Sequence, residues 1–202
     1  MAGPLRGSQG GAAFKWDGNG TTTVNAAEGT SCAALYFHAE IEILNVKCHS
    51  ADTSGCFTAS SGAVILFAAP ASTCNPGLGQ GFVADDPGSK IYFVDTGFNF
   101  GAQAGVASAV TVFSALNGRI ITFEHAETIK FLGDVKFSEA NFVIANLGGI
   151  FLSGTKFDTG GFTITGLRFF CGRFSVLGAG SSPNKVIPGS VDGIIGSDCK
   201  SF

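Results

Sequence analysis

Short apolar runs separated by glycine-bounded turns recur along the chain, and a phrase of the form Phe-x-Ala comes before each turn. The copies are Phe57-Thr-Ala59, Phe82-Val-Ala84 and Phe113-Ser-Ala115, with a looser one at Phe142-Val-Ile-Ala145. Gly62, Gly88 and Gly118 end the first three phrases at intervals of 26 and 30 residues, and a phenylalanine follows each glycine five residues later. A repeat of this length indicates one supersecondary unit stacked on copies of itself.

Each repeat contains runs of four to seven residues rich in Ile, Val and Phe, such as residues 39–44, 64–67 and 91–94. Gly, Asn, Asp, Ser or Pro separates these runs, as expected of short strands joined by tight turns. Only residues 124–132 have a spacing that would allow a helical turn. A repeat of this size with three short strands matches one rung of a parallel β-helix. A sandwich or barrel also uses short strands, but would not repeat phrase by phrase.

Stacked rungs place equivalent residues over one another at about 4.8 Å. We therefore expect an interior ladder of Phe67, Phe93 and Phe123, and a column of tight corners at the phrase-ending glycines. The residues just before those glycines suit such corners and include Asp86, Asn117 and Asn146.

The ends of the chain depart from the repeat. Residues 1–30 are rich in Gly, Ala, Asn and Thr, and we expect them to form an attachment arm or a cap. Phe14 and Trp16 are the candidate attachment residues, because exposed aromatic side chains can anchor to another protein. Residues 31–180 should form the solenoid, and residues 181–202, with two of the six prolines, a C-terminal cap or tail.

The composition favours an oligomer. Hydrophobic residues make up 45% of the chain and charged residues 13%, against a usual charged share of about 25%. So few charges leave solvent-facing surface hard to cover, and burial between subunits removes that difficulty. Twenty Phe beside one Trp and two Tyr favour interior aromatic columns over a sugar-stacking surface.

Other partners are not indicated. The net charge is −3 and no basic run is present, so nothing points to nucleic-acid binding. No apolar run approaches the ~18 residues of a membrane span, and the N-terminus lacks the apolar stretch of a secretory signal, so we expect synthesis in a cytoplasm.

Six cysteines lie at positions 32, 48, 56, 74, 171 and 199. Their spacing forms no zinc motif, and no metal or cofactor is indicated. Cys32 and Cys56 are 24 residues apart, and Cys48 and Cys74 are 26 apart, each about one repeat. We expect each pair to stack in successive turns as small buried thiols, reduced because the chain folds in a cytosol.

Glycan cleavage needs two carboxylic groups about 5–9 Å apart. Asp95 and His125 are each seven residues beyond a phrase glycine, and Glu124 precedes His125. Stacking would bring these three residues onto adjacent rungs, and they are the catalytic candidates if the chain is an enzyme. The alternative is a solvated turn at the end of a strand.

Other acidic residues have simpler interpretations. Asp85 and Asp86 adjoin Pro87-Gly88 and suit a turn, while Glu40 and Glu42 alternate with isoleucines and suit the outward face of a strand.

The rungs of the form Cys-Phe-x-Ala-x-x-Gly-Ala-x-Ile resemble the right-handed β-helix modules of bacteriophage tail fibres and tailspikes. The end is similar too, in segments 166–169, 178–180 and 188–193, where the family often has Thr-Gly-x-Arg-Tyr, a glycine-rich turn and a Pro-Gly tail. The resemblance covers about residues 31–196, with Phe169 where the family has Tyr, and the chain begins at its own Met1 while family modules usually end longer chains. It implies an all-β, right-handed parallel β-helix of about five or six rungs, assembled as a homotrimer.

The resemblance implies a structural virion spike or fibre that attaches to the particle through its N-terminal arm and contacts bacterial surface polysaccharide or another receptor. The alternative is a polysaccharide-degrading tailspike, a hydrolase or lyase that uses acidic residues on the β-helix. Only 15 Asp and Glu residues, and few Trp and Tyr, favour binding without catalysis.

Overall fold

The computed structural model of the chain describes residues 5–7, 13–26, 30–50, 55–68, 72–75, 79–94, 96–101, 111–117, 120–123, 125, 127–180 and 182–202. Within these residues the chain forms three parallel sheets and one short helix.

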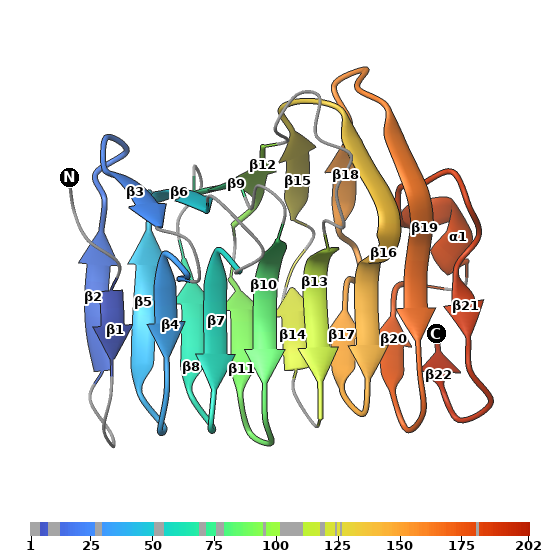
Figure 1. Cartoon of the computed structure of the whole chain (residues 1–202), viewed down its shortest axis with the longest axis horizontal. Coiled ribbons are helices and arrows are strands. Elements are labelled where there is room, and N and C mark those ends of the chain that lie inside the picture. The colour runs from blue at the N-terminus through green and yellow to red at the C-terminus, as the bar shows by residue number, and fades with distance from the viewer. Residues whose placement is uncertain are drawn as a thin grey trace.

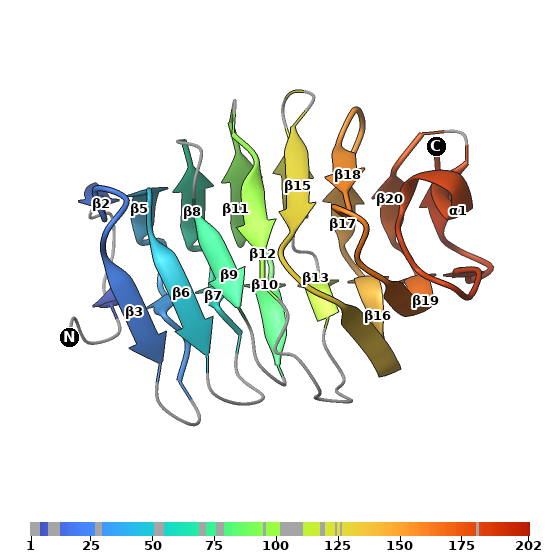
Figure 2. The ribbon, with the colours of Figure 1, turned by 90° about the horizontal axis from the view of Figure 1, so that it is seen from above.

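Each sheet takes one strand from every turn of the chain (Figures 1 and 2). Sheet 1 contains β1 (Leu5–Gly7), β4 (Ala33–Leu35), β7 (Phe57–Ser60), β10 (Gln80–Asp85), β13 (Thr111–Leu116), β16 (Val135–Asn146), β19 (Ile164–Cys171) and β21 (Ile194–Ile195). Sheet 2 contains β2 (Ala13–Asp17), β5 (Glu40–Leu44), β8 (Val64–Phe67), β11 (Lys90–Phe93), β14 (Ile120–Phe123), β17 (Gly149–Phe151), β20 (Val176–Gly178) and β22 (Lys200–Ser201). Sheet 3 contains β3 (Thr23–Ala26), β6 (Lys47–Ser50), β9 (Thr73–Asn75), β12 (Phe98–Phe100), β15 (Thr128–Phe131) and β18 (Lys156–Asp158).

This order, one strand in each sheet per turn, makes a right-handed parallel β-helix of about six turns and confirms the expected fold. The two ends of the chain lie at opposite ends of the solenoid (Figure 1). After β20, where an earlier turn has its third strand, the chain forms α1 (Pro183–Val186) and then buries Ile187.

The repeating strands extend beyond residues 31–180 at both ends. Strands β1 to β3 form a first turn within residues 1–30, and β21 and β22 pair with the last turn from within residues 181–202. The sequence allowed a helical turn at residues 124–132. This prediction is wrong for residues 128–131, which form strand β15. Thr128 and Lys130 face outward there while Ile129 and Phe131 are buried, and this alternation is the period of a strand.

The register of sheet 1 follows the sequence repeat. Phe82 pairs with Phe57 on one side and with Phe113 on the other. In the looser fourth copy, Val143 rather than Phe142 pairs with Phe113. The fourth copy has one more residue between its Phe and Ala, so Ala145 still pairs with Ala115. Strand β16 also has an irregularity in its pairing with β19, between Phe137 and Asn141.

Two ladders of phenylalanine rings fill the core between sheets 1 and 2. In sheet 2, Phe93 stacks on Phe67 and Phe123 with ring centroids 4.9 Å and 4.3 Å apart, as expected from the spacing. In sheet 1, Phe82 stacks on Phe57 and Phe113 at 5.5 Å and 5.6 Å. The ladders meet edge to face, an arrangement favoured by the ring quadrupoles.

The core beside sheet 3 changes along the solenoid. In the fourth and fifth turns its strands contribute Phe98, Phe100, Ile129 and Phe131, all buried, and in the sixth turn Phe157 packs partly buried against the same core. In the first three turns the inward positions of β3, β6 and β9 hold smaller residues, namely Val24, Ala26, Cys48, Ser50 and Cys74.

The corners between sheets 1 and 2 use left-handed backbone. Gly62 and Gly88 have φ of 80° and 83°, and a Cβ on Gly88 would lie 3.5 Å from the Cα of Gly62, so the two glycines stack as expected. Gly118 lies outside the described residues. Asp86 and Asn117 also have positive φ, whereas in the next turn Leu147 rather than Asn146 takes this conformation.

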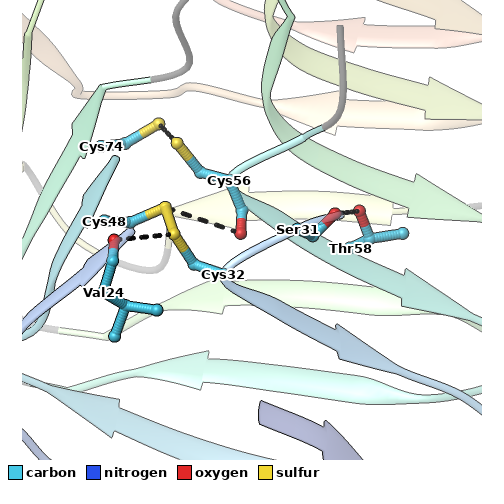
Figure 3. Close-up of a disulfide and its surroundings, with 7 residues drawn as sticks. All are labelled: Val24, Ser31, Cys32, Cys48, Cys56, Thr58 and Cys74. Carbon is cyan, nitrogen blue, oxygen red and sulfur yellow. Dashed lines mark hydrogen bonds between the residues drawn. A yellow bond between two sulfur atoms is a disulfide. The ribbon is translucent and has the colours of Figure 1, made fainter. Parts of the chain in front are cut away.

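Four of the six cysteines form disulfides, so the expectation of reduced thiols is wrong for them. Cys32 is bonded to Cys48 and Cys171 to Cys199 (Figure 3 shows the first). The expected stacking of Cys48 and Cys74 is confirmed by their pairing between β6 and β9. The spacing between turns indicated which cysteines stack, but a disulfide joins residues within one turn or across the cap.

Replacing Phe93 with Ala should lower the free energy of unfolding by about 3–5 kcal/mol, because it removes a fully buried ring in the middle of a ladder. Denaturant unfolding measures this change. Phe162→Ala is the control, because this ring is 41% exposed and its loss should cost no more than about 0.5 kcal/mol. Equal losses in the two variants would contradict the ladder's role.

Candidate functional site

Of the three catalytic candidates the structure describes one, His125, which lies between β14 and β15. Asp95 and Glu124 lie outside the described residues. His125 is exposed, and its carbonyl oxygen accepts a hydrogen bond from the backbone N–H of Glu127 at 3.0 Å. The catalytic role of the three residues stays a prediction.

Glu127 was not singled out by the sequence, yet it is the one charged residue that is buried among those described, with 7% of its surface exposed. Its carbonyl oxygen accepts a hydrogen bond from the Lys156 N–H at 2.7 Å, which fixes the backbone of this turn. The stacking of β12, β15 and β18 puts Thr96 and Thr155 at the equivalent positions of the neighbouring turns, and both are buried. Polar residues at one place in three successive turns are the signal that could have identified it.

This corner provides one buried carboxylate where glycan cleavage needs two. The second would have to come from Asp95 or Glu124. The described residues contain no cluster of three His, Cys, Asp or Glu side chains that could hold a metal ion.

Phe14 and Trp16, the candidate attachment residues, lie on β2. They pair with Ile41 and Ile43 of β5 and alternate with the exposed residues Ala13, Lys15 and Asp17. Both rings are partly buried and pack against the core, so they cover its N-terminal end. Their attachment role stays a prediction.

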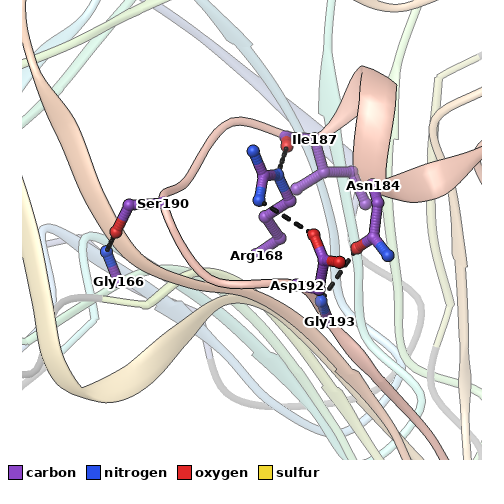
Figure 4. A network of polar contacts seen from close by, with 7 residues as sticks. All are labelled: Gly166, Arg168, Asn184, Ile187, Ser190, Asp192 and Gly193. Atoms are coloured by element: carbon purple, nitrogen blue, oxygen red, sulfur yellow. Dashed lines mark hydrogen bonds and ion pairs between the residues drawn. The ribbon is translucent and has the colours of Figure 1, made fainter.

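Two of the three C-terminal segments that carry the family resemblance, residues 166–169 and 188–193, lie together in one cluster with Asn184 and Ile187 (Figure 4). Arg168 donates from Nε to the carbonyl oxygen of Ile187 at 3.1 Å and forms an ion pair with Asp192 at 3.3 Å. The Gly193 N–H donates to the Asn184 side chain at 2.8 Å, and the Gly166 N–H donates to Ser190 Oγ at 2.9 Å.

Two glycines of this cluster are required by close packing. A Cβ on Gly193 would collide with the ring of Phe169, and one on Gly189 would lie 2.8 Å from Cγ of Arg168. Together with the disulfide between Cys171 and Cys199, these contacts hold residues 182–202 against the last turns. The cluster therefore closes the solenoid, and its role is structural.

The outer face of sheet 2 is largely apolar from the third turn onward, together with Leu44 at the end of β5. Its outward-facing side chains alternate with the buried residues of the same strands and are mostly half-buried, because neighbouring turns cover their flanks. We call the following residues the apolar outer face: Leu44, Val64, Leu66, Ala68, Tyr92, Val94, Phe151, Val176 and Phe202. Among the described residues, Lys90 and Lys200 are the charges that lie within it, and Glu40 and Glu42 of β5 border it at its N-terminal side.

The outer face of sheet 3 has the opposite character. All of its outward-facing residues that the structure describes on strands are polar: Thr23, Asn25, Lys47, His49, Thr73, Asn75, Asn99, Thr128, Lys130, Lys156 and Asp158. Because both sheets cover the same core, the difference between them concerns what lies outside. A polar sheet face is stable in water, whereas a continuous apolar one indicates a contact surface.

A shallow hollow of about 300 Å³ lies at the N-terminal end of sheet 2 and is lined by Ala13, Phe14, Lys15, Glu40, Glu42 and Leu66. Lys15 forms an ion pair with Glu42 at 3.2 Å, and Glu40 is exposed. The expected outward direction of Glu40 and Glu42 is confirmed, because Ile41 and Ile43 are fully buried.

No helix within the described ranges is long and apolar enough to cross a membrane. Comparisons with protein-family models, with curated protein sequences and with solved structures found no match to this chain.

Replacing Arg168 with Met should destabilise the C-terminal closure by about 1–3 kcal/mol, because the buried carbonyl group of Ile187 loses its donor. The check is amide hydrogen exchange, in which residues 182–195 should lose protection first. Arg173→Met is the control, because this arginine is exposed. Unchanged protection in the Arg168 variant would show that the cluster does not hold the end.

Proposed function

We propose that the chain is a structural spike or fibre protein of a bacteriophage virion that assembles as a homotrimer and contacts the bacterial surface without catalysis. The observation that carries this proposal is the apolar outer face of sheet 2, beside a sheet 3 whose described outward-facing strand residues are all polar. The β-helix fold and the C-terminal cluster formed by the motif residues agree with the family resemblance.

The size of sheet 2 suits a contact between copies. The six strands from β8 to β22 at about 4.8 Å spacing, each about four residues long, give roughly 400 Å² in projection. Two such faces bury about 800 Å² in projection, and the relief of their side chains brings the accessible area toward the roughly 1,000 Å² at which specific interfaces begin. Side-by-side packing of three solenoids would cover this face in each of them and leave sheet 3 facing solvent.

Such a trimer would act as a stiff rod that presents repeated contacts to the bacterial surface. Cross-turn hydrogen bonds and ring ladders make each solenoid stiff, and three parallel copies present the same polar ladder three times. Three weak contacts with a surface polysaccharide gain strength through effective concentration. Attachment to other virion proteins would fall to the N-terminal end, within residues 1–30.

The purified chain should behave as a trimer in light scattering. Leu66→Lys together with Tyr92→Glu should dissociate it, because both charges would be buried in the contact. Thr128→Lys together with Asn99→Glu places the same charges on the outer face of sheet 3 and should leave the trimer intact. Circular dichroism checks that both variants stay folded. A stable monomer of the unchanged chain would refute the proposal.

The chain should bind capsular polysaccharide or lipopolysaccharide purified from its bacterial host without shortening it. Co-sedimentation measures binding, and gel analysis of the glycan measures cleavage. Asp95→Asn, Glu124→Gln and Glu127→Gln should each leave binding unchanged. A glycan-cleaving activity that falls about 10²–10⁴-fold in one of these variants, with the trimer intact, would favour the depolymerase instead.

A further inference from the structure

The two free cysteines, Cys56 and Cys74, occupy the same positions in the third turn as the Cys32–Cys48 disulfide occupies in the second. Cys74 pairs directly with Cys48 between β6 and β9. Cys32 and Cys56 each precede a paired residue, because Ala33 lies opposite Phe57. Since stacked turns follow the same path, the pair in the third turn takes its geometry from a pair that is bonded, with Cα atoms 5.9 Å apart.

The sulfur atoms of Cys56 and Cys74 are in contact in the folded chain. The Cys74 thiol contacts the Cys56 sulfur at 2.6 Å, and both residues are almost completely buried (Figure 3). The bonded pair lies directly beside them, with the Cys48 sulfur 3.8 Å from the carbonyl oxygen of Cys56.

In the fourth turn, other residues occupy the positions that Cys56 and Cys74 have in the third. Phe100 takes the place of Cys74, and Gly81 takes the place of Cys56. A Cβ on Gly81 would lie 2.7 Å from the carbonyl oxygen of Val112 in the next turn and 3.3 Å from the Phe100 ring, so a side chain here would crowd both. A large ring thus fills this corner in the fourth turn, whereas two cysteines share it in each of the two preceding turns.

Disulfides would compensate for the small core residues of sheet 3 in the first three turns. The inward residues of sheet 3 in the first three turns are small, so this end buries less apolar surface than the phenylalanine-rich turns that follow. Disulfides commonly supply stability where a hydrophobic core is insufficient.

We propose that Cys56 and Cys74 form a third disulfide, stacked on Cys32–Cys48, when the chain folds in the presence of a small-molecule disulfide such as oxidised glutathione. One cysteine thiolate attacks the reagent's S–S bond, forming a mixed disulfide and releasing one glutathione thiolate. The second cysteine thiolate then attacks the protein sulfur of that mixed disulfide and releases the other. The two cysteines lose two protons and two electrons, and the reagent becomes two thiols.

The bond has to form before the third turn closes. Burial raises the pKa of the Cys74 thiol well above its usual value, and the contact with the Cys56 thiol raises it further. Since the thiolate is the nucleophile, the folded dithiol is unreactive and reagents cannot reach it. A chain folded under reducing conditions should therefore keep this pair as thiols when oxidant is added later.

The test refolds the full chain with and without oxidised glutathione, alkylates remaining thiols in denaturant and maps the bonds by mass spectrometry without reduction. Cleavage after Phe57 and Phe67 separates Cys56 from Cys74, and cleavage at Asp52 separates Cys48 from Cys56. The chain refolded with oxidant should carry no alkylated cysteine and should yield a peptide pair joined through Cys56 and Cys74. Alkylated Cys56 and Cys74 beside two intact disulfides, or bonds from either one to Cys32 or Cys48, would overturn the proposal.

Stability provides a second measurement. Refolded with oxidant, the unchanged chain should unfold about 5–10 °C above the Cys56→Ala/Cys74→Ala variant. Under reducing conditions the difference should shrink, because both chains then lack the bond. A matched variant, Cys32→Ala/Cys48→Ala, should show a loss of similar size at the neighbouring turn. If either variant fails to fold, the disulfides mapped by mass spectrometry in the unchanged chain still test the proposal.

Discussion

The in-register stacking of phenylalanine rings is the constraint on which the rest of this structure depends. A ring that lies flat on the ring of the next turn fixes the height and rotation of each turn, so insertions must be absorbed in the loops between strands. Phe67, Phe93 and Phe123 keep this register although the intervals between them differ, at 26 and 30 residues. The corners follow from the same constraint, because the chain must reverse tightly at Gly62 and Gly88 to return each ring to its column.

The repeat in the sequence was sufficient to predict the fold and the ladder of sheet 2, because both depend on residues one turn apart. The repeat did not predict the structure correctly where neighbouring turns differ. Val143 takes the place expected for Phe142 because the fourth copy has one more residue between its Phe and Ala, and Ala145 keeps its pairing with Ala115. Residues 13–26 have a composition typical of an arm, but Phe14, Trp16 and Val24 are enough inward residues to build a turn. Cysteine spacing indicated stacking, whereas bonding depends on the path within one turn, which the spacing between turns does not encode.

The candidate sites were harder to predict for a related reason. Core positions must repeat, but outward positions and loops are free to vary, and the chemistry of Asp95, Glu124 and His125 depends on loop geometry. What the repeat does reveal is which residues share an outer face. Extending each strand's alternation across the turns separates the apolar outer face of sheet 2 from the polar face of sheet 3. Glu127 also becomes visible in this way, as one of three buried polar residues at equivalent positions.

Aromatic contacts measured in solution test the stacked ladder most directly. In a chain with isotope-labelled phenylalanine, nuclear Overhauser effects report which ring protons lie within contact of one another. The ring of Phe93 should show contacts with both Phe67 and Phe123, two residues far from it in sequence and far from each other. A Phe93 ring that contacts neither of them would contradict the stacked solenoid, and with it the assignment of the outer faces.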